Sequence, residues 1–262
     1  MDVSRYNSLA WDIQVDNKNR WTVPVNKSII NDAKKGKWEI ILTPTKAVPK
    51  EWFPKISSID VLCLASGGGQ QGPILSAAGG NVTVFDNSNK QLEQDRYVAE
   101  RDSLSLNTVK GDMRDLSVFP DKSFDLIVHP VSNLFVPGII SVWAESYRVL
   151  RSEGIMISGF MNPVHYIFNQ ILAEREGILE VKYTLPYSDI ENLTEVEKQK
   201  YISEGTPFEF SHTLEEQISG QLKAGFVITG FYEDRFENID EDPLSKYLAT
   251  FIATRSQKLS KI

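Results

Sequence analysis

The chain has 262 residues, 41% of them apolar and 24% charged, which is enough for one large α/β domain with a buried core. Its formal net charge is -7 and no block of Lys or Arg stands out, so a nucleic-acid partner is disfavoured. A single cysteine, Cys63, excludes a disulfide framework and a cysteine metal cluster. Because the N-terminus lacks an apolar signal core and no apolar run reaches membrane-spanning length, we expect a cytoplasmic protein without a membrane partner.

The first 50 residues lie outside any regular alternation of strands and helices. One short helix is predicted here, capped by Asn26 and ended by Gly36. Aromatic side chains are scattered around it, namely Tyr6, Trp11, Trp21 and Trp38. We expect residues 1–50 to form an N-terminal cap that packs on a core domain of residues 51–262.

Strands and helices alternate from about residue 59 onward, which implies right-handed crossovers and a largely parallel sheet. The last two strands are joined by an acidic, turn-rich segment, 233–243, and we expect a hairpin-like antiparallel edge there. The predicted fold class is therefore a three-layer α/β fold with helices on both faces of the sheet. The predicted strands are Asp60–Leu64, Val82–Phe85, Thr108–Lys110, Phe124–His129, Gly154–Phe160, Phe226–Tyr232 and Ala249–Arg255.

Helices between these strands carry recognisable ends. Two pairs of residues have the form of a capping box at a helix start, Ser88 with Gln91 and Thr213 with Glu216. Another helix, apolar on one face, is predicted to start at Pro137 and to stop at Gly154.

Residues 161–212 form an insertion between two predicted strands. A helix that begins at Pro163 is predicted to carry apolar residues at Val164, Ile167, Phe168, Ile171 and Leu172. A second, polar helix is predicted with a cap formed by Thr194 and Glu197. The insertion is rich in aromatic residues, which either roof a pocket for a small molecule or pack in a core: Tyr166, Phe168, Tyr183, Tyr187, Phe208 and Phe210.

The segment from Val61 to Gly72 is the most informative part of the chain. Apolar residues predict a short buried strand, three glycines follow as a turn, and an apolar-periodic stretch to Gly79 predicts a helix. Such a turn lets a ligand approach the backbone at a helix N-terminus, where free N–H groups point outward. The spacing Gly67-x-Gly69-x-x-Gly72 matches the dinucleotide fingerprint, although a purely structural turn would show it too. No Gly-Lys-Ser/Thr follows, which disfavours a P-loop.

Acidic residues follow the second and third predicted strands. Asp86 can accept hydrogen bonds from both hydroxyls of a ribose. Asp112 can accept one from the exocyclic amine of an adenine, and Met113 would then cover the ring face. Two neighbouring negative charges suit a cationic cofactor without phosphates better than a pyrophosphate. S-adenosylmethionine, which carries a sulfonium, meets that requirement.

The ordered series of motifs resembles the class I S-adenosylmethionine-dependent methyltransferases over about residues 59–160. The matching segments are Val61–Gly69 (glycine-rich motif), Asp86 (ribose-binding acid), Asp112-Met113 (adenine-binding pair), Phe124–Val128 (fourth strand) and Glu145–Gly154 (helix and turn before the fifth strand). The resemblance implies a Rossmann-like, seven-stranded, mostly parallel sheet with an antiparallel last strand. It also implies S-adenosylmethionine as cofactor, with binding residues Ala65, Ser66, Gly67, Gly68, Gly69, Gln70, Asp86, Asn87, Asp112, Met113, Pro130 and Val131.

The chain departs from the family's pattern at two positions. Cys63 stands where an acidic residue is common, so another group must hold the methionine amine of the cofactor. Ala65 stands where a glycine is common, and it is small enough for the loop to close. If the N-terminal segment folds over the site, Trp11, Arg20 and Trp21 are the candidates for that role.

Methyl transfer is an in-line displacement at carbon, so the protein chiefly positions the nucleophile about 3 Å from the methyl carbon and excludes water. A general base is needed only if the acceptor is protonated. His129, after the fourth strand, is the first candidate and His165, in the insertion, is the second; a packing role would explain either histidine as well. The three histidines lack ligand spacing, and no metal is predicted.

The sequence favours a methyltransferase that acts on a small molecule. Relatives that methylate amino groups of DNA bases commonly have an Asn/Asp-Pro-Pro-aromatic loop, of which this chain keeps only Pro130, and this again disfavours nucleic acid. Two alternatives stay open. One is an NAD(P)-dependent Rossmann oxidoreductase, because of the fingerprint and Asp86; the other is a non-catalytic S-adenosylmethionine-binding protein, because of Cys63. We expect a monomer or a homodimer.

Overall fold

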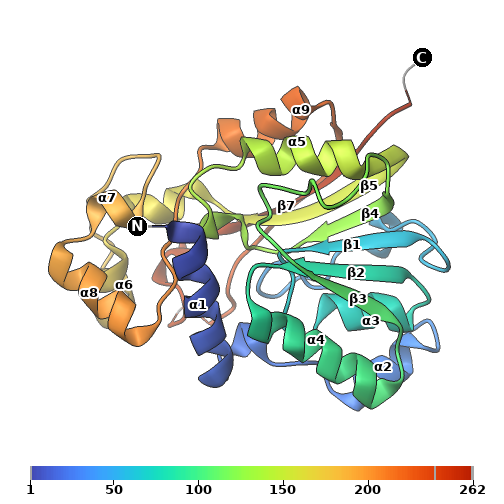
Figure 1. Ribbon diagram of the computed structural model, residues 1–262. Coiled ribbons are helices and arrows are strands. Elements are labelled where there is room, and N and C mark those ends of the chain that lie inside the picture. Colours follow the sequence, from blue (N-terminus) through green and yellow to red (C-terminus); the bar gives the residue numbers. More distant parts are fainter. Residues whose placement is uncertain (1, 239, 261–262) are drawn as a thin grey trace.

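A seven-stranded sheet forms the middle layer of the computed structural model, which describes residues 2–238 and 240–260 (Figure 1). The strand order is β3-β2-β1-β4-β5-β7-β6. Neighbouring strands among β1 to β5 pair in parallel, whereas β7 pairs antiparallel with both β5 and β6. The strands are β1 (Asp60–Leu64), β2 (Asn81–Asp86), β3 (Leu106–Lys110), β4 (Phe124–His129), β5 (Leu150–Met161), β6 (Val227–Asp234) and β7 (Phe251–Gln257).

This topology confirms the predicted fold class. The expected antiparallel pair, β6 with β7, lies at one side of the sheet. The antiparallel strand itself, β7, lies between β5 and β6, so β6 forms the edge. The parallel strands therefore end together along one edge of the sheet, where ligands bind in folds of this kind.

Helices cover both faces of the sheet (Figure 1). On one face lie α5 (Ile140–Val149) and α9 (Gly220–Ala224), and on the other lie α2 (Lys27–Ala33), α3 (Gln71–Ala77) and α4 (Asn89–Asp102). Because side chains alternate along a strand, Val61 and Cys63 of β1 join one buried cluster. Leu62 and Leu64 join the other. The central strands are thus buried on both faces, as is usual for a parallel sheet.

The chain passes from α5 to β5 earlier than predicted. The helix begins at Ile140 rather than at Pro137, and it ends at Val149. The strand begins at Leu150 rather than at Gly154, because Leu150 already pairs with the neighbouring strand β4. Ladder hydrogen bonds therefore replace helical ones over the last residues of the predicted helix.

The predicted caps at Ser88 and Thr213 are present. Ser88 Oγ accepts a hydrogen bond from Gln91 N at 3.1 Å. Thr213 Oγ1 accepts one from Glu216 N, also at 3.1 Å, and a π turn then leads into α9. Single turns complete the pattern: η1 (Arg20–Thr22), η2 (Lys50–Trp52), η3 (Asn133–Phe135), η5 (Glu215–Ser219) and η6 (Pro243–Lys246).

The N-terminal segment holds a helix that the sequence did not predict, α1 (Val3–Asp16). Its buried residues include Asn7 and Ser8, so no apolar stripe at helical spacing marks it. Polar contacts dock it instead. Asn7 Nδ2 donates hydrogen bonds to the carbonyl oxygens of Phe135 and Phe208, each at 2.9 Å.

The insertion after β5 forms a lobe beyond one end of the sheet (Figure 1). The prediction of a continuous apolar helix from Pro163 is wrong, because Asn169 interrupts it and caps a new helix, its Oδ1 accepting from Leu172 N at 3.4 Å. The predicted polar helix is present with its capping box. The elements of the lobe are η4 (Pro163–Ile167), α6 (Gln170–Glu176), α7 (Asp189–Asn192) and α8 (Glu195–Glu204).

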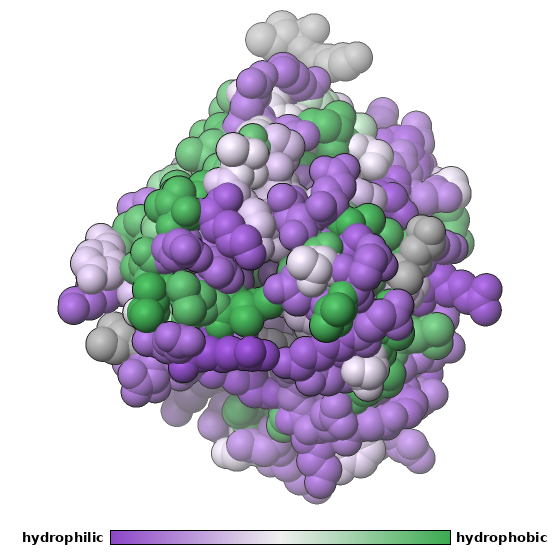
Figure 2. Space-filling model, turned by 90° about the vertical axis from the view of Figure 1, so that its left-hand side faces the viewer, coloured by the Kyte–Doolittle hydropathy of each residue, from purple (hydrophilic) through white to green (hydrophobic). Residues whose placement is uncertain are grey.

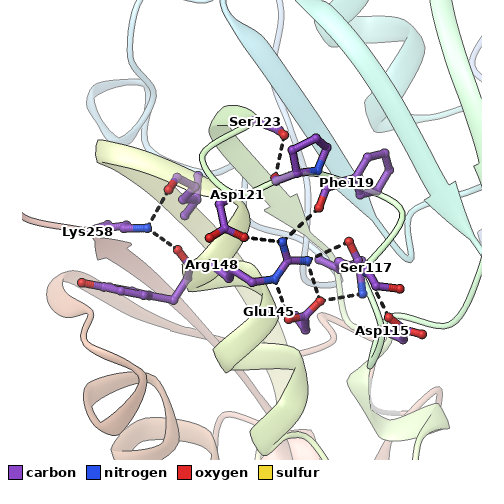
Figure 3. A network of polar contacts seen from close by, with 12 residues as sticks. Asp115, Ser117, Phe119, Asp121, Ser123, Glu145, Arg148 and Lys258 are labelled. Carbon is purple, nitrogen blue, oxygen red and sulfur yellow. Dashed lines mark hydrogen bonds and ion pairs between the residues drawn. The ribbon is translucent and has the colours of Figure 1, made fainter.

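One side chain, Arg148, ties the loop between β3 and β4 to α5 (Figure 3). Its guanidinium donates five hydrogen bonds, which go to the carboxylates of Glu145 and Asp121 and to the carbonyl oxygens of Leu116 and Phe119. This matches the five donors of an arginine fork. The loop begins with the predicted adenine-binding pair, Asp112 and Met113. The network therefore holds in place the loop that carries this pair.

Candidate active site

A cavity of about 1300 Å³ opens at the edge of the sheet where the parallel strands end. Residues that follow β1, β2, β3 and β4 line it, together with residues of the N-terminal segment and of the segment after β6. Figure 2 views the molecule from this side and shows a hollow near the middle of the face, bordered by hydrophilic and hydrophobic residues. The position is the one at which open α/β sheets bind ligands.

Most of the predicted cofactor residues lie on the wall of this cavity. They are Ala65, Ser66, Gly67, Gln70, Asp86, Asn87, Asp112, Met113, Pro130 and Val131. Gly68 and Gly69 do not line it. Their φ angles, +117° and +74°, lie in the left-handed region that glycine adopts without strain. These two residues therefore shape the turn and do not touch what the cavity holds.

Asp86 joins the glycine turn to the start of α4. Its Oδ2 accepts a hydrogen bond from Gly67 N and its Oδ1 accepts one from Ser88 N, each at 2.9 Å. Burial raises the pKa of Asp86, although these two bonds act to lower it. A backbone hydrogen bond from Asn87 also acts on this carboxylate. Because a carboxylate offers about four acceptor sites, Asp86 can still accept a hydrogen bond from a ligand hydroxyl.

Asp95, on α4, supports the glycine turn from behind. Its side chain is fully buried, and Oδ2 accepts a hydrogen bond from Gly68 N at 3.0 Å. Burial, helped by the nearby Asp86, outweighs the backbone hydrogen bonds from Gly68 and Gly69 and raises the pKa of Asp95 to about 8. The carboxyl is therefore mostly protonated at neutral pH. No pattern in the sequence marked Asp95 as part of the site.

Asp95 lies near Cys63, the position on β1 at which the family resemblance led us to expect an acid. The Cys63 thiol is fully buried, and burial together with the nearby Asp95 raises its pKa. A carboxyl is thus present here, but it comes from α4. Because Asp95 does not line the cavity, it supports the turn and leaves the methionine end of a cofactor to other groups.

Ala65 is held in a conformation that favours glycine. Its φ is +47°, in the left-handed region, and its N–H donates to Phe85 O at 2.7 Å. A side chain in this region costs roughly 1–2 kcal/mol. The alanine therefore lets the turn close, as expected, but with local strain.

Helix α1 reaches over the ends of β2 and β3. Ser4 Oγ donates to Asp112 Oδ2 at 2.8 Å, and Ser8 Oγ donates to Asn87 O at 2.7 Å. Asn87 Nδ2 returns a bond to Ser4 O at 2.7 Å. Burial alone would raise the pKa of Asp112, but hydrogen bonds from Arg114 and Ser4 lower it below its usual value. Asp112 thus lies on the cavity wall as an ionised carboxylate that is paired with Arg114 at 2.6 Å.

The chain after α1 is hydrogen-bonded to the glycine turn. Val25 N donates to Gly69 O at 3.0 Å. Gln70 Nε2 donates to Val23 O, also at 3.0 Å. The N-terminal segment thus lies against the predicted cofactor loop and forms the wall opposite the strand ends.

Trp11, Arg20 and Trp21 all line the cavity from this N-terminal side. The Arg20 guanidinium carbon lies 4.3 Å from the centre of the Trp21 ring and 5.1 Å from that of Phe236. Arg20 also forms an ion pair with Glu241. This group brings the N-terminal segment into contact with the chain after β6 across the cavity.

His129 does not line the cavity. It is fully buried, its Nδ1 lies 2.9 Å from Leu64 O, and its ring packs edge-on against Trp143. Burial lowers the pKa of His129 to about 4, so the ring is neutral at pH 7. This placement agrees with the packing role that the sequence left open, and Ser132, three residues on, lines the cavity instead.

His165 also lies away from the cavity wall, on η4. Its Nδ1 is 3.9 Å from Asp242 Oδ1 and makes no hydrogen bond. Burial lowers the pKa of His165, and Asp242 partly opposes this. The structure therefore brings neither predicted base to the cavity.

Glu209 lines the cavity, although the sequence interpretation passed over it. Its carboxylate accepts a hydrogen bond from Tyr166 OH at 2.7 Å. Burial and the nearby Asp189 raise the pKa of Glu209 to about 8. The local pattern, an acid between the buried Phe208 and Phe210, is typical of a strand whose acid faces water. Only the docking of the lobe turns that side toward the cavity.

The aromatic residues of the insertion do not roof the cavity. Those that are buried pack within the lobe: Tyr166, Tyr187, Phe208 and Phe210. The aromatic residues on the cavity wall come from other segments: Trp11, Trp21, Trp38, Phe135, Phe236 and Phe251. The insertion was expected either to roof a pocket or to pack in a core. Its buried aromatic residues pack in a core.

The cavity wall is predominantly acidic. Its charged residues are Asp32, Glu39, Asp86, Asp112, Glu209, Glu237 and Glu241 against Arg20, Lys37 and Lys50. A cationic cofactor without phosphates fits this charge, and a pyrophosphate does not.

Among the described residues, no group of three or more His, Cys, Asp or Glu side chains is arranged to hold a metal ion. No helix formed by those residues has the length and apolarity needed to cross a membrane.

Comparisons with known proteins identify relatives of the chain. Residues 62–158 match a family model described as a methyltransferase domain. A Bacillus subtilis protein described as "Uncharacterized methyltransferase YbaJ" is 55% identical over 254 residues, which cover 97% of this chain and 98% of that one. A sterol 24-C-methyltransferase of Gibberella zeae is 33% identical over 99 residues, which cover 37% of this chain and 25% of that protein.

Solved structures show the same fold at low sequence identity. A S-adenosylmethionine-dependent methyltransferase from Mesorhizobium loti superposes with a TM-score of 0.62 at 16% identity, covering 79% of this chain and 94% of that one. A cyclase, SpnF, superposes with a TM-score of 0.54 at 16% identity, covering 78% of this chain and 77% of that one. Likeness of this degree establishes the fold and not the reaction.

The relative from Bacillus subtilis, by contrast, extends over nearly the whole chain. It is described as a methyltransferase, as is the matching family model, so neither the oxidoreductase nor the non-catalytic alternative is favoured. The ordered motifs and the seven-stranded sheet are consistent with both comparisons. The chain belongs to the class I S-adenosylmethionine-dependent methyltransferases.

Proposed function

We propose that the protein binds S-adenosylmethionine in this cavity and transfers its methyl group to a small-molecule acceptor. The observation that carries the proposal is that three successive strand ends bring Gly67, Asp86 and Asp112 to one cavity. The volume, about 1300 Å³, exceeds the roughly 300–1,000 Å³ of a typical small-molecule site. An acceptor can therefore lie beside the cofactor.

Each part of the cofactor has a partner on the cavity wall. Asp86 would hold the ribose hydroxyls, and Asp112 would hold the adenine amine with Met113 against the ring. Arg20 and Trp21 would enclose the methionine end, in place of the acid that relatives carry on β1. When bound, S-adenosylmethionine supplies an electrophilic methyl group on a sulfonium.

The protein's own share of the chemistry is mainly positional. Residues of the wall align the acceptor with the methyl carbon and exclude water, because displacement at a sulfonium carbon needs little else. The loop after β4, with Pro130 and Val131, lines the cavity and would border both ligands. Because His129 and His165 lie away from the wall, we do not assign either of them as a base.

Calorimetric titration with S-adenosylmethionine, S-adenosylhomocysteine and NAD tests the proposal. We expect micromolar binding of the first two, and at least about tenfold weaker binding in Asp86→Ala, which corresponds to roughly 1.4 kcal/mol. Asp125→Ala is the matched control, because that acid pairs with Arg151 at the start of β4, at the opposite edge. Binding of NAD alone would refute the proposal.

The acceptor class is tested separately by transfer of a labelled methyl group. We expect label in small molecules and none in DNA or RNA, since the net charge is -7 and the cavity wall is acidic. Label recovered in nucleic acid would contradict this.

The cytoplasmic location and the monomeric or homodimeric state stay predictions. Analytical ultracentrifugation measures the oligomeric state.

A further inference from the structure

We propose that Glu209 receives the methyl acceptor and that the acceptor carries a basic amine. This inference rests on the proposed methyl transfer and names the class of substrate for the same site. Glu209 shares the cavity wall with Pro130 and Val131, after β4, and with Met161, at the end of β5. The predicted cofactor contacts come mainly from the ends of β1, β2 and β3. Phe210 N donates to Leu134 O at 2.7 Å, which places the segment that carries Glu209 beside η3, after β4. We take this part of the cavity as the acceptor side, because fewer of the predicted cofactor contacts come from it.

The backbone around Glu209 is fixed from three elements. Asn7 on α1 accepts a hydrogen bond from the N–H of the preceding residue at 2.8 Å. Phe210 N donates to Leu134 O at 2.7 Å, and the N–H of Glu209 itself donates to Asp189 Oδ2 at 2.7 Å. These bonds hold the backbone in place, and the hydrogen bond from Tyr166 OH, at 2.7 Å, holds the Glu209 carboxylate. This is the requirement for a group that orients a substrate.

The Glu209 carboxyl lies in acidic surroundings. Its hydrogen-bond donor is the neutral Tyr166 OH, at 2.7 Å. The charged residues that act on it, Asp189 on α7 and Glu174 on α6, are both acidic. Negative charge on a partly buried carboxyl beside two other acids is costly, and a bound ammonium group would offset that cost. The wall as a whole carries more acids than bases, which favours the same kind of ligand.

Binding of an ammonium group at Glu209 has a measurable consequence. Burial, together with Asp189 and Glu174, raises the pKa of Glu209 to about 8, while the bond from Tyr166 acts in the opposite direction. At pH 7 the free protein therefore holds this carboxyl mostly protonated. A bound ammonium favours the carboxylate, so binding should release a proton to solvent.

The same carboxylate can complete the reaction. The ammonium nitrogen gives one proton to Glu209, and the lone pair that is freed attacks the methyl carbon. The N–C bond forms as the C–S bond breaks, and the electron pair of that bond stays on sulfur. The positive charge thus moves from sulfur to the methylated nitrogen, and Glu209 ends protonated.

Matched pairs of amine and alcohol test the inference without turnover. Benzylamine with benzyl alcohol, butylamine with butanol, and tryptamine with tryptophol are titrated into the protein saturated with S-adenosylhomocysteine, at pH 7 in two buffers of different ionisation enthalpy. We expect at least one amine to bind about tenfold more tightly than its alcohol, or roughly 1.4 kcal/mol. We expect that binding to release about one proton.

Variants assign the effect to one side chain. Glu209→Gln should abolish both the amine preference and the proton release while S-adenosylhomocysteine still binds. Glu204→Gln, an exposed acid of the same lobe, should keep both. Tyr166→Phe removes the bond that lowers the pKa of Glu209, so it should move the proton release to higher pH.

Two results would overturn the inference. One is the absence of an amine preference in every pair, and the other is proton release that persists in Glu209→Gln. Failure of S-adenosylhomocysteine to bind the unmodified protein would instead contradict the proposed function. The two proposals can therefore fail independently.

Discussion

The buried carboxyl of Asp95 accepts a hydrogen bond from the backbone N–H of Gly68 at 3.0 Å. Through this contact α4 supports the glycine turn beside the cavity. The carboxyl is mostly protonated at neutral pH, because burial raises its pKa to about 8. An uncharged side chain of the same shape should therefore accept this hydrogen bond equally well.

We expect Asp95→Asn to preserve the turn and Asp95→Leu to disrupt it. The asparagine oxygen can accept the Gly68 bond, whereas leucine leaves a buried N–H unpaired at a cost of roughly 1–3 kcal/mol. The folded-state pKa, about 8, lies above the ordinary value of 3.8, so the contribution of Asp95 to stability is complete below pH 4 and is lost as the pH rises toward 8. Urea unfolding at pH 5 and pH 9 should show a smaller loss in Asp95→Asn than in the unmodified protein. An equal loss would argue against the buried, protonated acid.

Ala65→Gly should stabilise the protein by about 1 kcal/mol. The gain comes from relief of the left-handed conformation, roughly 1–2 kcal/mol, less the greater unfolded-state entropy of glycine, about 0.4–1 kcal/mol. Thermal or urea unfolding measures it. Ala99→Gly is the control, since it lies within the helix α4 and should lose about 1 kcal/mol. Destabilisation in both would mean that position 65 is not strained.

Arg20→Ala and Trp21→Ala should each weaken binding of S-adenosylhomocysteine about tenfold, or roughly 1.4 kcal/mol. Both side chains line the cavity opposite the strand ends. Val23→Ala is the matched control, because Val23 is exposed, lies off the cavity wall, and offers the turn only its carbonyl oxygen. Full affinity in both test variants would remove the proposed role of this segment at the methionine end.

Arg148→Lys should lower both stability and cofactor affinity. Lysine keeps the charge but cannot reproduce five donors in a planar fork, and we expect a loss of about 1–2 kcal/mol in unfolding free energy. The loop between β3 and β4 would loosen at its base, so binding of S-adenosylhomocysteine should weaken a fewfold. Arg151→Lys, which affects ion pairs at the opposite edge of the sheet, should lower stability and leave binding unchanged.

The sheet could be predicted from the sequence because its central strands are short apolar runs separated by turn residues. β1 and β4 have the predicted bounds, since Gly, Pro or Asp residues mark their ends. The boundary between α5 and β5 could not be predicted, because pairing of Leu150 with Phe124 decides it and the pairing is not local. Helix α1 was missed for a related reason. Polar side chains such as Asn7 dock it, so it has no apolar periodicity.

The place of Asp86 and Asp112 on the cavity wall was predictable, because it depends on where strands end. The site was not predictable where side-chain direction matters. His129 ends a strand beside the cavity, yet its ring turns into the core toward Leu64 O. Glu209 has the local pattern of a solvent-facing acid, and only the docking of the lobe brings it to the cavity.

Helix α1 spans the two halves of the cavity. Ser4 binds Asp112 on the cofactor side at 2.8 Å, and Asn7, one turn later, binds the segment that carries Glu209. A ligand that stabilises the position of α1 at Asp112 should therefore also stabilise the segment that carries Glu209. Thermodynamic linkage makes such an effect reciprocal, so any change that cofactor binding causes in the affinity for the acceptor, through this helix, should be matched by an equal change in the affinity for the cofactor.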